Sequence, residues 1–151
     1  MRIIGIDPGK KGAATVMSMD GEIIDVIQFS KVTEHDIAAA FIEYSDGEKC
    51  YAFIERVHSF PKMGRVPSFN LGEKYGFIRG LLVALKIPFE TVLASKWQGA
   101  LGCRSKGIKN ITKAKAQQLF PGHPQITHDI ADSILIAEYG RHKKQMEFNL
   151  V

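Results

Sequence analysis

Three short apolar runs separated by tight turns fill the first 30 residues, and this pattern constrains the fold more than any other feature of the chain. The runs cover residues 2–7, 12–19 and 22–29. Asp20-Gly21 joins the last two runs. A two-residue turn that ends in glycine is a strong β-hairpin signal, because glycine accepts the positive φ that such turns need. The amino-terminal part is therefore predicted to form three strands, two of them joined as a hairpin.

Helical patterns alternate with further strands in the rest of the chain, which indicates an α/β fold. The expected helices cover residues 33–44, with Thr33 as the capping residue, then 68–86, a short segment from Ser95 through Trp97, 112–120 and 128–141; the expected further strands cover 51–55 and 89–93. A polar loop without periodicity covers residues 57–67, a second loop covers 99–110, and we expect a loose tail after the last helix.

Three glycines recur at intervals of four in the longest predicted helix. Gly72, Gly76 and Gly80 form a flat ridge on it. Such a ridge permits close packing against a sheet or a partner helix. Trp97, by contrast, is expected in the core or at an interface.

Four acidic residues stand where predicted elements begin or end. Asp7 ends the first apolar run and precedes Pro8-Gly9, and Glu55 ends the run 51–55. Asp129 and Asp132 are three residues apart at the start of the last predicted helix, so both face the same way. Taken alone, Asp7 before Pro-Gly is typical of a turn residue, and Asp129 near a helix start is typical of a capping residue. Neither turn formation nor helix capping explains Glu55 at the end of a strand.

Several acids at one end of a sheet are what a site for hard divalent cations requires, since Mg²⁺ prefers oxygen ligands. Asp7, Glu55, Asp129 and Asp132 together predict a site for two Mg²⁺ ions, about 4 Å apart in sites of this type. One ion would activate a water and the other would stabilise the departing oxygen of a phosphodiester. The predicted reaction class is metal-assisted hydrolysis.

The ordered set of motifs resembles the RuvC-type Holliday junction resolvases, particularly the compact forms carried by phages. The resemblance rests on residues 3–9 at the first strand, 54–55 at the fourth, and 129–133 at the last helix. Residues 69–80 also look like the long glycine-bearing helix of that family. The resemblance therefore covers nearly the whole chain.

This resemblance implies a ribonuclease H-like fold, with a five-stranded mixed sheet flanked by helices. It also implies a homodimer that cuts four-way DNA with Mg²⁺ or Mn²⁺. Asp7, Glu55, Asp129 and Asp132 would be the catalytic, metal-binding acids, with Asp7 bridging two ions. Lys106 and Lys109 fall where the family places lysines that contact the scissile region.

One position departs from the family pattern. Bacterial members have an aromatic residue three positions after the fourth-strand acid, where this chain has His58. Phe60 is the nearest aromatic residue, and Phe69 is the alternative. The residues expected to contact DNA are Lys10, Phe60, Lys62, Arg65, Phe69, Arg104, Lys106, Lys109 and Lys113. The basic ones are close in sequence to the acids, which predicts an affinity that falls steeply with added salt.

Length and composition agree with one soluble nuclease domain over residues 1–151. The chain has 20 Lys and Arg against 16 Asp and Glu, a net charge of +4, which suits a polyanionic partner. No apolar stretch is long enough for a membrane span and no signal-peptide pattern is present, so we expect a cytoplasmic protein. Cys50 and Cys103 lack metal-ligand spacing and are expected to be free thiols.

Three alternatives remain at this level. The first is a ribonuclease H-like nuclease that acts on other branched DNA, such as flaps or three-way junctions. The second is a branched-DNA-binding module without chemistry, although all four acids are present. The third is an actin-like kinase or ATPase, but such chains have two duplicated halves, and 151 residues hold only one.

Overall fold

The computed structural model of the protein describes residues 1–57 and 62–150, and its centre is one mixed sheet. The strands are β1 (Arg2–Asp7), β2 (Ala13–Ser18), β3 (Ile23–Gln28), β4 (Cys50–Glu55) and β5 (Phe89–Val92). Their order in the sheet is β3-β2-β1-β4-β5. β1 is antiparallel to β2 but parallel to β4, and β4 is parallel to β5. The five-stranded mixed sheet predicted from the sequence is confirmed.

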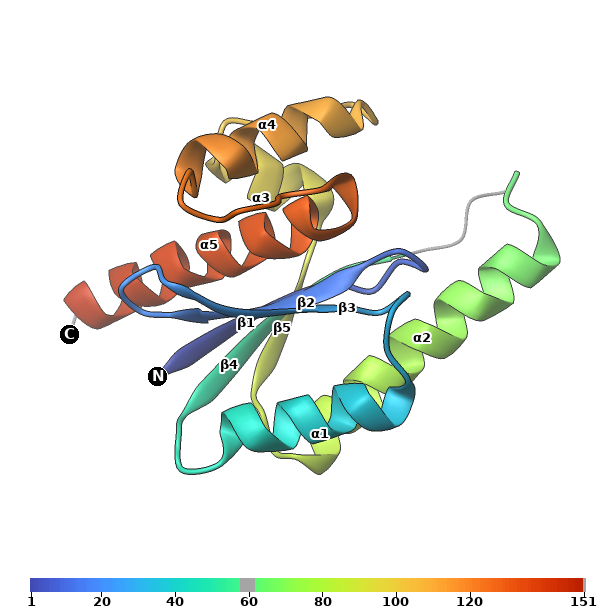
Figure 1. The fold of residues 1–151 in the computed structure, drawn as a ribbon, viewed down its shortest axis with the longest axis horizontal. Helices are drawn as coiled ribbons and strands as arrows, with labels where there is room; N and C mark the ends of the chain where they lie inside the picture. The colour runs from blue at the N-terminus through green and yellow to red at the C-terminus, as the bar shows by residue number, and fades with distance from the viewer. Residues whose placement is uncertain (58–61, 151) are drawn as a thin grey trace.

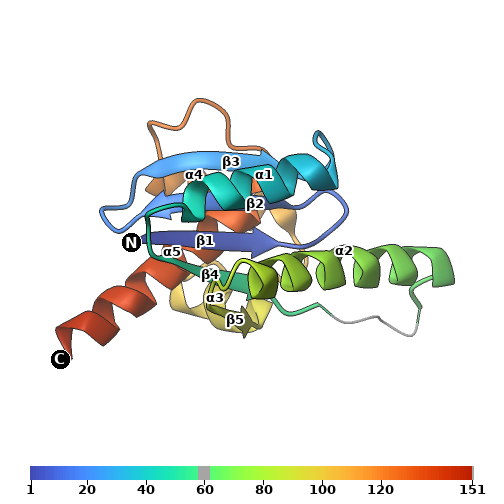
Figure 2. The same cartoon turned by 90° about the horizontal axis from the view of Figure 1, so that it is seen from below.

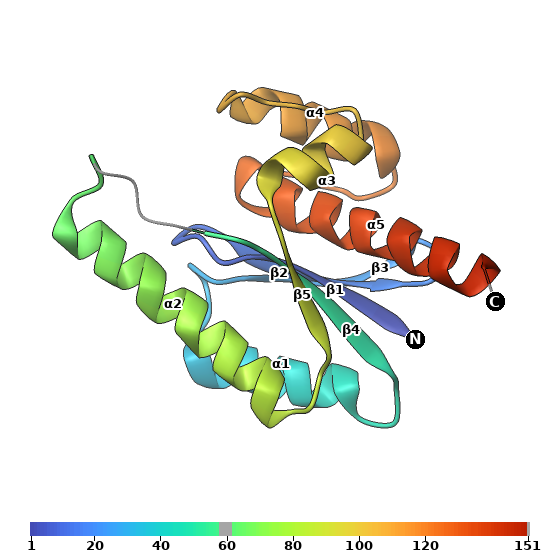
Figure 3. The ribbon, with the colours of Figure 1, turned by 180° about the vertical axis from the view of Figure 1, so that it is seen from behind.

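Helices cover both faces of this sheet. They are α1 (Glu34–Ser45), α2 (Arg65–Ala84), α3 (Ala94–Ala100), α4 (Lys109–Leu119) and α5 (His128–Asn149). Figure 1 shows α1 and α2 on one face and α3, α4 and α5 on the other, and Figure 3 shows the same layers from behind. Each face has its own apolar core: Phe41, Ile78 and Leu82 belong to one, and Trp97 and Ile134 to the other.

The predicted hairpin and the first predicted helix are confirmed. Gly21 has φ +90° in the turn between β2 and β3, which explains the glycine there. Thr33 caps α1 through its side chain, and Asp36 returns the bond as a capping box. α1 then packs on the sheet through Ile37 and Phe41, which are fully buried.

The central helix α5 lies unusually close to β1. A methyl group on Gly5 would stand 2.1 Å from the backbone nitrogen of Ala137 and 2.4 Å from the carbonyl oxygen of Ser133. Gly140 likewise permits close packing of α5 on the sheet, because a Cβ there would stand 2.3 Å from the ring of Phe53. Only glycine permits this approach, so Gly5 determines how near the start of α5 comes to the end of β1.

Several helix boundaries differ from those predicted. α2 begins at Arg65 instead of residue 68, with Pro67 in its first turn, where a missing N–H costs no intrahelical bond. Ser95 does not cap α3, since the capping position is Leu93 and no side chain bonds there. α4 begins at Lys109, so this lysine lies on a helix and not in a loop.

The expectation of a loose tail after residue 141 is wrong, because α5 continues to Asn149. Its last turns are held to the sheet by side chains that the periodicity did not reveal. Lys143 bonds Glu90 of β5, and the Lys144 ammonium lies 3.6 Å from the ring centroid of Tyr51 on β4. These contacts hold the second half of α5 against the sheet, although its buried residues end at Gly140.

The glycine ridge of α2 does not pack against the sheet. No atom of the described residues lies within 4 Å of the Cβ position at Gly72, Gly76 or Gly80. The opposite side of α2 makes the sheet contact, through Ile78 and Leu82. Figure 2 shows that α2 also runs past the end of the sheet toward which β1 points.

Two smaller expectations can be compared with the structure. Cys50 and Cys103 are both free, as predicted, and both are buried. In the ranges 1–57 and 62–150, every helix is too short or too polar to cross a membrane.

Candidate active site

Asp7 and Glu55 end neighbouring parallel strands and therefore lie at the same edge of the sheet. The register pairs Ile6 with Ile54, so the two acids are the next residues on β1 and β4. Side chains alternate along a strand, and Ile3 and Phe53 both face the α5 layer. Asp7 and Glu55, an even number of residues further on, face that layer too.

The amino-terminal turns of α5 bring the other two acids to this edge. Ser133 contacts the Cβ position of Gly5, and its hydroxyl lies 2.8 Å from the hydroxyl of Thr15 on β2. Asp132 precedes this anchored serine. Asp129 lies one turn earlier, in the first turn of α5. The structure thus brings together at one edge four residues that are up to 125 positions apart, from Asp7 to Asp132.

Asp7 is the electrostatic centre of this group. Burial raises the pKa of its carboxyl to about 6, and the charges of Asp132 and Asp129 act in the same direction. The Gly9 N–H, which donates to Asp7 Oδ1 at 3.0 Å, and the Lys109 ammonium oppose the shift. Asp7 therefore makes the turn bond expected of an Asp before Pro-Gly and also faces the other acids.

Glu55 has one oxygen fixed and one free. The Trp97 indole N–H donates to Glu55 Oε2 at 2.9 Å. Burial raises the pKa of Glu55 to about 7, and the charges of Asp7 and Asp132 add to the shift, while the bond from Trp97 lowers it. A carboxyl with a pKa near 7 exchanges its proton at neutral pH.

Asp132 is half-buried, and within residues 1–57 and 62–150 its Oδ1 has no hydrogen-bond partner. Burial raises its pKa, whereas the hydroxyl of Thr112 and the charges of Lys109 and His128 lower it. The Thr112 hydroxyl donates to the Lys109 carbonyl at 3.2 Å, and so does not satisfy Oδ1. A buried carboxylate oxygen without a partner is costly unless a cation or a donor reaches it.

The donor set suits a hard cation, although the acids are not drawn together tightly. Among residues 1–57 and 62–150, no three His, Cys, Asp or Glu side chains stand close enough to hold a metal ion. The chemistry nevertheless fits Mg²⁺, since all four donors are half-buried carboxylates, burial raises the pKa of Asp7, Glu55 and Asp132, and Asp132 Oδ1 finds no hydrogen-bond partner among the described residues.

Of the predicted basic residues, Lys109 lies nearest the acids. It is the first residue of α4, and its charge lowers the pKa of both Asp7 and Asp132. Lys106 is exposed and has φ +47°, a left-handed conformation that only glycine adopts freely. Lys113 is half-buried on α4 beside a polar cavity that Thr127 also lines, and Arg104 is exposed near Gly99.

The other predicted DNA contacts fall into two groups. Lys10 is exposed in the turn directly after Asp7, and Lys62, Arg65 and Phe69 are exposed before and along the first turns of α2. Phe69 is 70% exposed, which is unusual for a phenylalanine. Phe60 lies outside the residues that the structure describes.

Trp97 and Thr112 contact or face the acids but were not predicted as site residues. Trp97 is fully buried, in agreement with the prediction of a core residue, and its bond to Glu55 comes in addition. Nothing in the sequence joins it to Glu55, which is 42 positions away. A polar atom on a buried aromatic residue was the only available signal, because such atoms find partners.

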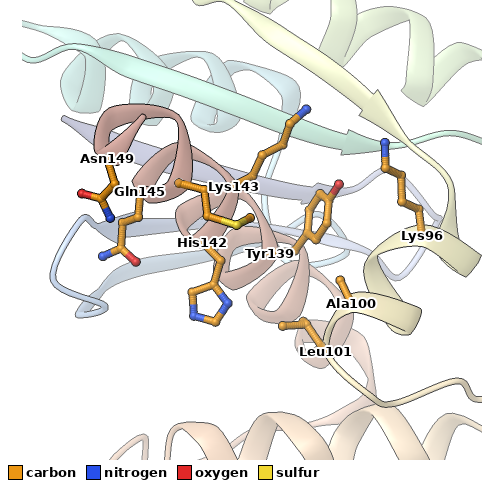
Figure 4. A pocket seen from close by; sticks show the side chains of 9 residues that line it. Lys96, Ala100, Leu101, Tyr139, His142, Lys143, Gln145 and Asn149 are labelled. Atoms are coloured by element: carbon orange, nitrogen blue, oxygen red, sulfur yellow. The ribbon is translucent and has the colours of Figure 1, made fainter. Parts of the chain in front are cut away.

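Two cavities differ in their relation to the acids. One of about 530 Å³ lies between α3 and the carboxyl-terminal half of α5, lined by Tyr139, His142 and Met146 among others and by no acid (Figure 4). A smaller one, of about 280 Å³, is lined by Glu55 together with Leu71 and Leu93. Only the second borders the candidate site.

Comparison with solved structures gives a consistent result. The structure of Thermus thermophilus RuvC in complex with a Holliday junction substrate matches with a TM-score of 0.68 and 16% identity, over 97% of this chain and 96% of that chain. A second T. thermophilus RuvC structure matches with a TM-score of 0.68 and 17% identity, over 97% of both chains. The chain has the RuvC fold.

The RuvC fold is a ribonuclease H-like α/β fold, so the fold class predicted from the sequence is confirmed. No protein-family model matches the chain, and no curated protein does. Because one fold hosts many activities, function must be argued from the acids and not from the RuvC fold alone.

Proposed function

We propose that the protein is a metal-dependent, structure-selective DNA endonuclease that resolves four-way Holliday junctions by hydrolysing phosphodiester bonds. The observation that carries the proposal is the group of half-buried acids at the shared end of β1 and β4 and in the first turns of α5. Burial raises the pKa of Asp7 to about 6 and that of Glu55 to about 7. Buried like charges of this kind have a clear purpose when a divalent cation neutralises them.

Asp7, Glu55, Asp129 and Asp132 would hold the metal, as two Mg²⁺ ions per site with Mn²⁺ as a substitute. The bound metal supplies Lewis-acid chemistry to water activation and to the leaving oxygen. Asp7 interacts through its charge with Glu55, Asp129 and Asp132 and would be the ligand that the two ions share. Asp132 Oδ1 would accept a cation, because no hydrogen bond from the described part of the chain engages it.

The chain's other groups would position the substrate. The Lys109 ammonium already acts on Asp7 and Asp132, so it is placed to offset charge on a phosphate that approaches them. The indole N–H of Trp97 donates a hydrogen bond to Glu55 Oε2, which would leave Glu55 Oε1 to bind the metal. Both residues lie on helices, Lys109 on α4 and Trp97 on α3, which suits a site that must hold a phosphodiester in one orientation.

Branched DNA would lie over the acid edge and the amino-terminal end of α2. Lys10, Lys62, Arg65 and Phe69 are exposed there, and Arg104, Lys106 and Lys113 extend the basic surface on the α4 side. We also propose that the protein acts as a homodimer, since a four-way junction has two equivalent strands to cut. Such an enzyme would work in the cytoplasm, where phage and bacterial DNA recombine.

The decisive test uses the acids themselves. Asp7→Asn and Glu55→Gln remove metal-ligand charge with little change in shape. Each variant is expected to lose cleavage of a synthetic four-way junction by at least a hundredfold, roughly the cost of removing one group that stabilises the transition state. Junction binding, measured by gel shift with Ca²⁺ in place of Mg²⁺, should stay close to wild type.

The matched control is Glu90→Gln, which alters a glutamate on β5 outside the acid group and should leave cleavage unchanged. Cleavage by Asp7→Asn or Glu55→Gln at the wild-type rate would refute the metal-site assignment. If the unaltered protein binds branched DNA but never nicks it with Mg²⁺ or Mn²⁺, the non-catalytic alternative holds. A panel of four-way, three-way and flap substrates distinguishes junction resolution from action on other branches.

A further inference from the structure

The sole tryptophan of the chain donates its indole N–H to one of the candidate metal ligands. The bond joins Trp97 Nε1 of α3 to Glu55 Oε2 of β4 over 2.9 Å. Glutamate has three rotatable side-chain bonds, so a Glu at the tip of a strand is the most mobile of the site's acids unless something fixes it. Trp97 makes the one hydrogen bond that the Glu55 carboxylate receives from the described residues.

The indole itself has no freedom to turn. Trp97 is fully buried in the core between α5 and the sheet, where Ile130 and Ala131 of α5 belong to the same apolar cluster. Ile130 and Ala131 lie between Asp129 and Asp132, so the turn of α5 that carries two acids packs in the same cluster as the residue that holds the third. A rigid donor of this kind fixes its acceptor with little loss of entropy.

The helix that carries Trp97 is also anchored on its other side. The neighbouring residue Gln98 accepts hydrogen bonds from the backbone N–H of Ser105 at 3.1 Å and from its hydroxyl at 3.3 Å. The Gln98 carbonyl accepts a further bond from Cys103 N–H at 2.9 Å. Ser105 precedes Lys106. One short helix therefore connects the Glu55 carboxylate with the basic loop.

We propose that Trp97 is a positioning residue for the metal centre: its indole N–H holds Glu55 Oε2, presents Oε1 to the cation, and so makes the sole tryptophan a reporter of metal binding. This inference rests on the proposed function, because it takes Glu55 as a metal ligand. Hydrogen-bond partners of metal ligands typically contribute ten- to hundredfold to metal affinity or activity.

The first test is spectroscopic and needs no DNA. The full-length wild-type protein is titrated with Mg²⁺ while tryptophan emission is recorded, and all of the emission comes from Trp97. We expect a saturable change, because the cation draws charge from the carboxylate that the indole contacts. Glu55→Gln should lose the response. Glu90→Gln, which changes a glutamate that bonds Tyr51 and Lys143, should keep it.

The second test removes the N–H but keeps an aromatic ring. Trp97→Phe is expected to weaken Mn²⁺ binding, measured by electron paramagnetic resonance of the free ion, roughly ten- to hundredfold. The Mg²⁺ concentration for half-maximal junction cleavage should rise by a similar factor. A merely structural role would lower the active fraction and leave both metal constants unchanged, which would refute the inference.

The outcomes separate this inference from the proposed function. Mg²⁺-dependent junction cleavage by the wild-type protein without any change in emission would overturn the role of Trp97 and leave the nuclease assignment intact. An emission response that Glu55→Gln abolishes, in a protein that cuts no DNA, would support the metal site and overturn the nuclease. If Trp97→Phe fails to fold, the wild-type titration still decides.

Discussion

At the scale of single residues, the environment that raises the pKa of Asp7 should also destabilise the folded protein when no metal is bound. Burial raises the pKa of Asp7 from 3.8 to about 6, so the folded chain holds this proton more tightly than the unfolded chain. The folded state therefore gains stability below about pH 4 and loses it as the pH rises to about 6. At pH 7.5 the folded state contains a buried charge that no cation offsets.

Asp7→Asn should therefore stabilise the metal-free protein while it abolishes cleavage. We expect the free energy of unfolding at pH 7.5 to rise by on the order of 3 kcal/mol, since the pKa of Asp7 rises from 3.8 to about 6 and one pKa unit corresponds to about 1.4 kcal/mol. The measurement is urea denaturation with EDTA present. At pH 4.5 the gain should fall to roughly 1 kcal/mol, because the wild-type carboxyl is then mostly protonated in the folded chain but still mostly ionised in the unfolded chain.

Asp46→Asn is the control for this prediction, since Asp46 is an exposed acid at the end of α1. It should change the free energy of unfolding little at either pH. Comparing each variant with wild type at the same pH cancels the titration of all other groups. An equal gain for Asp7→Asn at pH 4.5 and pH 7.5 would contradict the electrostatic explanation and point to a change in packing instead.

At the scale of elements, the contact between β1 and α5 should control both stability and the site. A methyl group at Gly5 would overlap the backbone of Ser133 and Ala137, which cannot rotate away. Gly5→Ala should therefore lower the free energy of unfolding by roughly 1–3 kcal/mol, as overpacking in cores does. It should also reduce junction cleavage in the protein that remains folded, because α5 moves Asp132 away from Asp7.

Gly72→Ala, on helix α2, is expected to have the opposite effect on stability. Nothing lies near its Cβ position in the described structure, and alanine favours a helix over glycine by roughly 0.5–1 kcal/mol. Thermal unfolding of the dilute, monomeric protein should show Gly72→Ala above wild type and Gly5→Ala below it. If both substitutions change the melting temperature in the same direction, the effect at Gly5 comes from the backbone freedom of glycine and not from the close approach of α5.

The elements also show what the sequence could and could not predict. Strands and their terminal acids were predictable, because Asp7 and Glu55 each follow an apolar run and parallel strands end at one edge. The second half of α5 was missed because its contacts, such as Lys143 with Glu90, come from charged side chains that carry no apolar period. The hydrogen bond from Trp97 to Glu55 depends on how α3 packs relative to β4, and local sequence patterns do not determine that packing.

At the scale of the whole molecule, α2 presents a surface that the monomer leaves open. Its buried side packs on the sheet, while Gly72, Gly76 and Gly80 face away with nothing near them. Val83, on the same side of the helix, is 66% exposed. An open ridge of small residues lets two helices approach closely, and a second copy of α2 is the partner that a symmetric dimer would supply.

We therefore predict a dimer in which the α2 helices of two copies pack against each other. Gly76→Arg places a long charged side chain on the ridge and should convert the protein to a monomer in sedimentation experiments, without loss of cooperative unfolding. Ala39→Arg adds the same charge at an exposed position of α1 and should leave the dimer intact.

The consequence for activity follows from geometry. A monomer keeps its own acids, so it should still nick a four-way junction, but its two cuts should become independent events. On a supercoiled plasmid that extrudes a cruciform, wild type should yield linear product directly, whereas Gly76→Arg should accumulate the nicked circle. Because both cuts need a subunit on each side of the junction, paired cleavage by a monomeric Gly76→Arg protein would show that one copy suffices. A Gly76→Arg protein that stays dimeric would place the interface elsewhere.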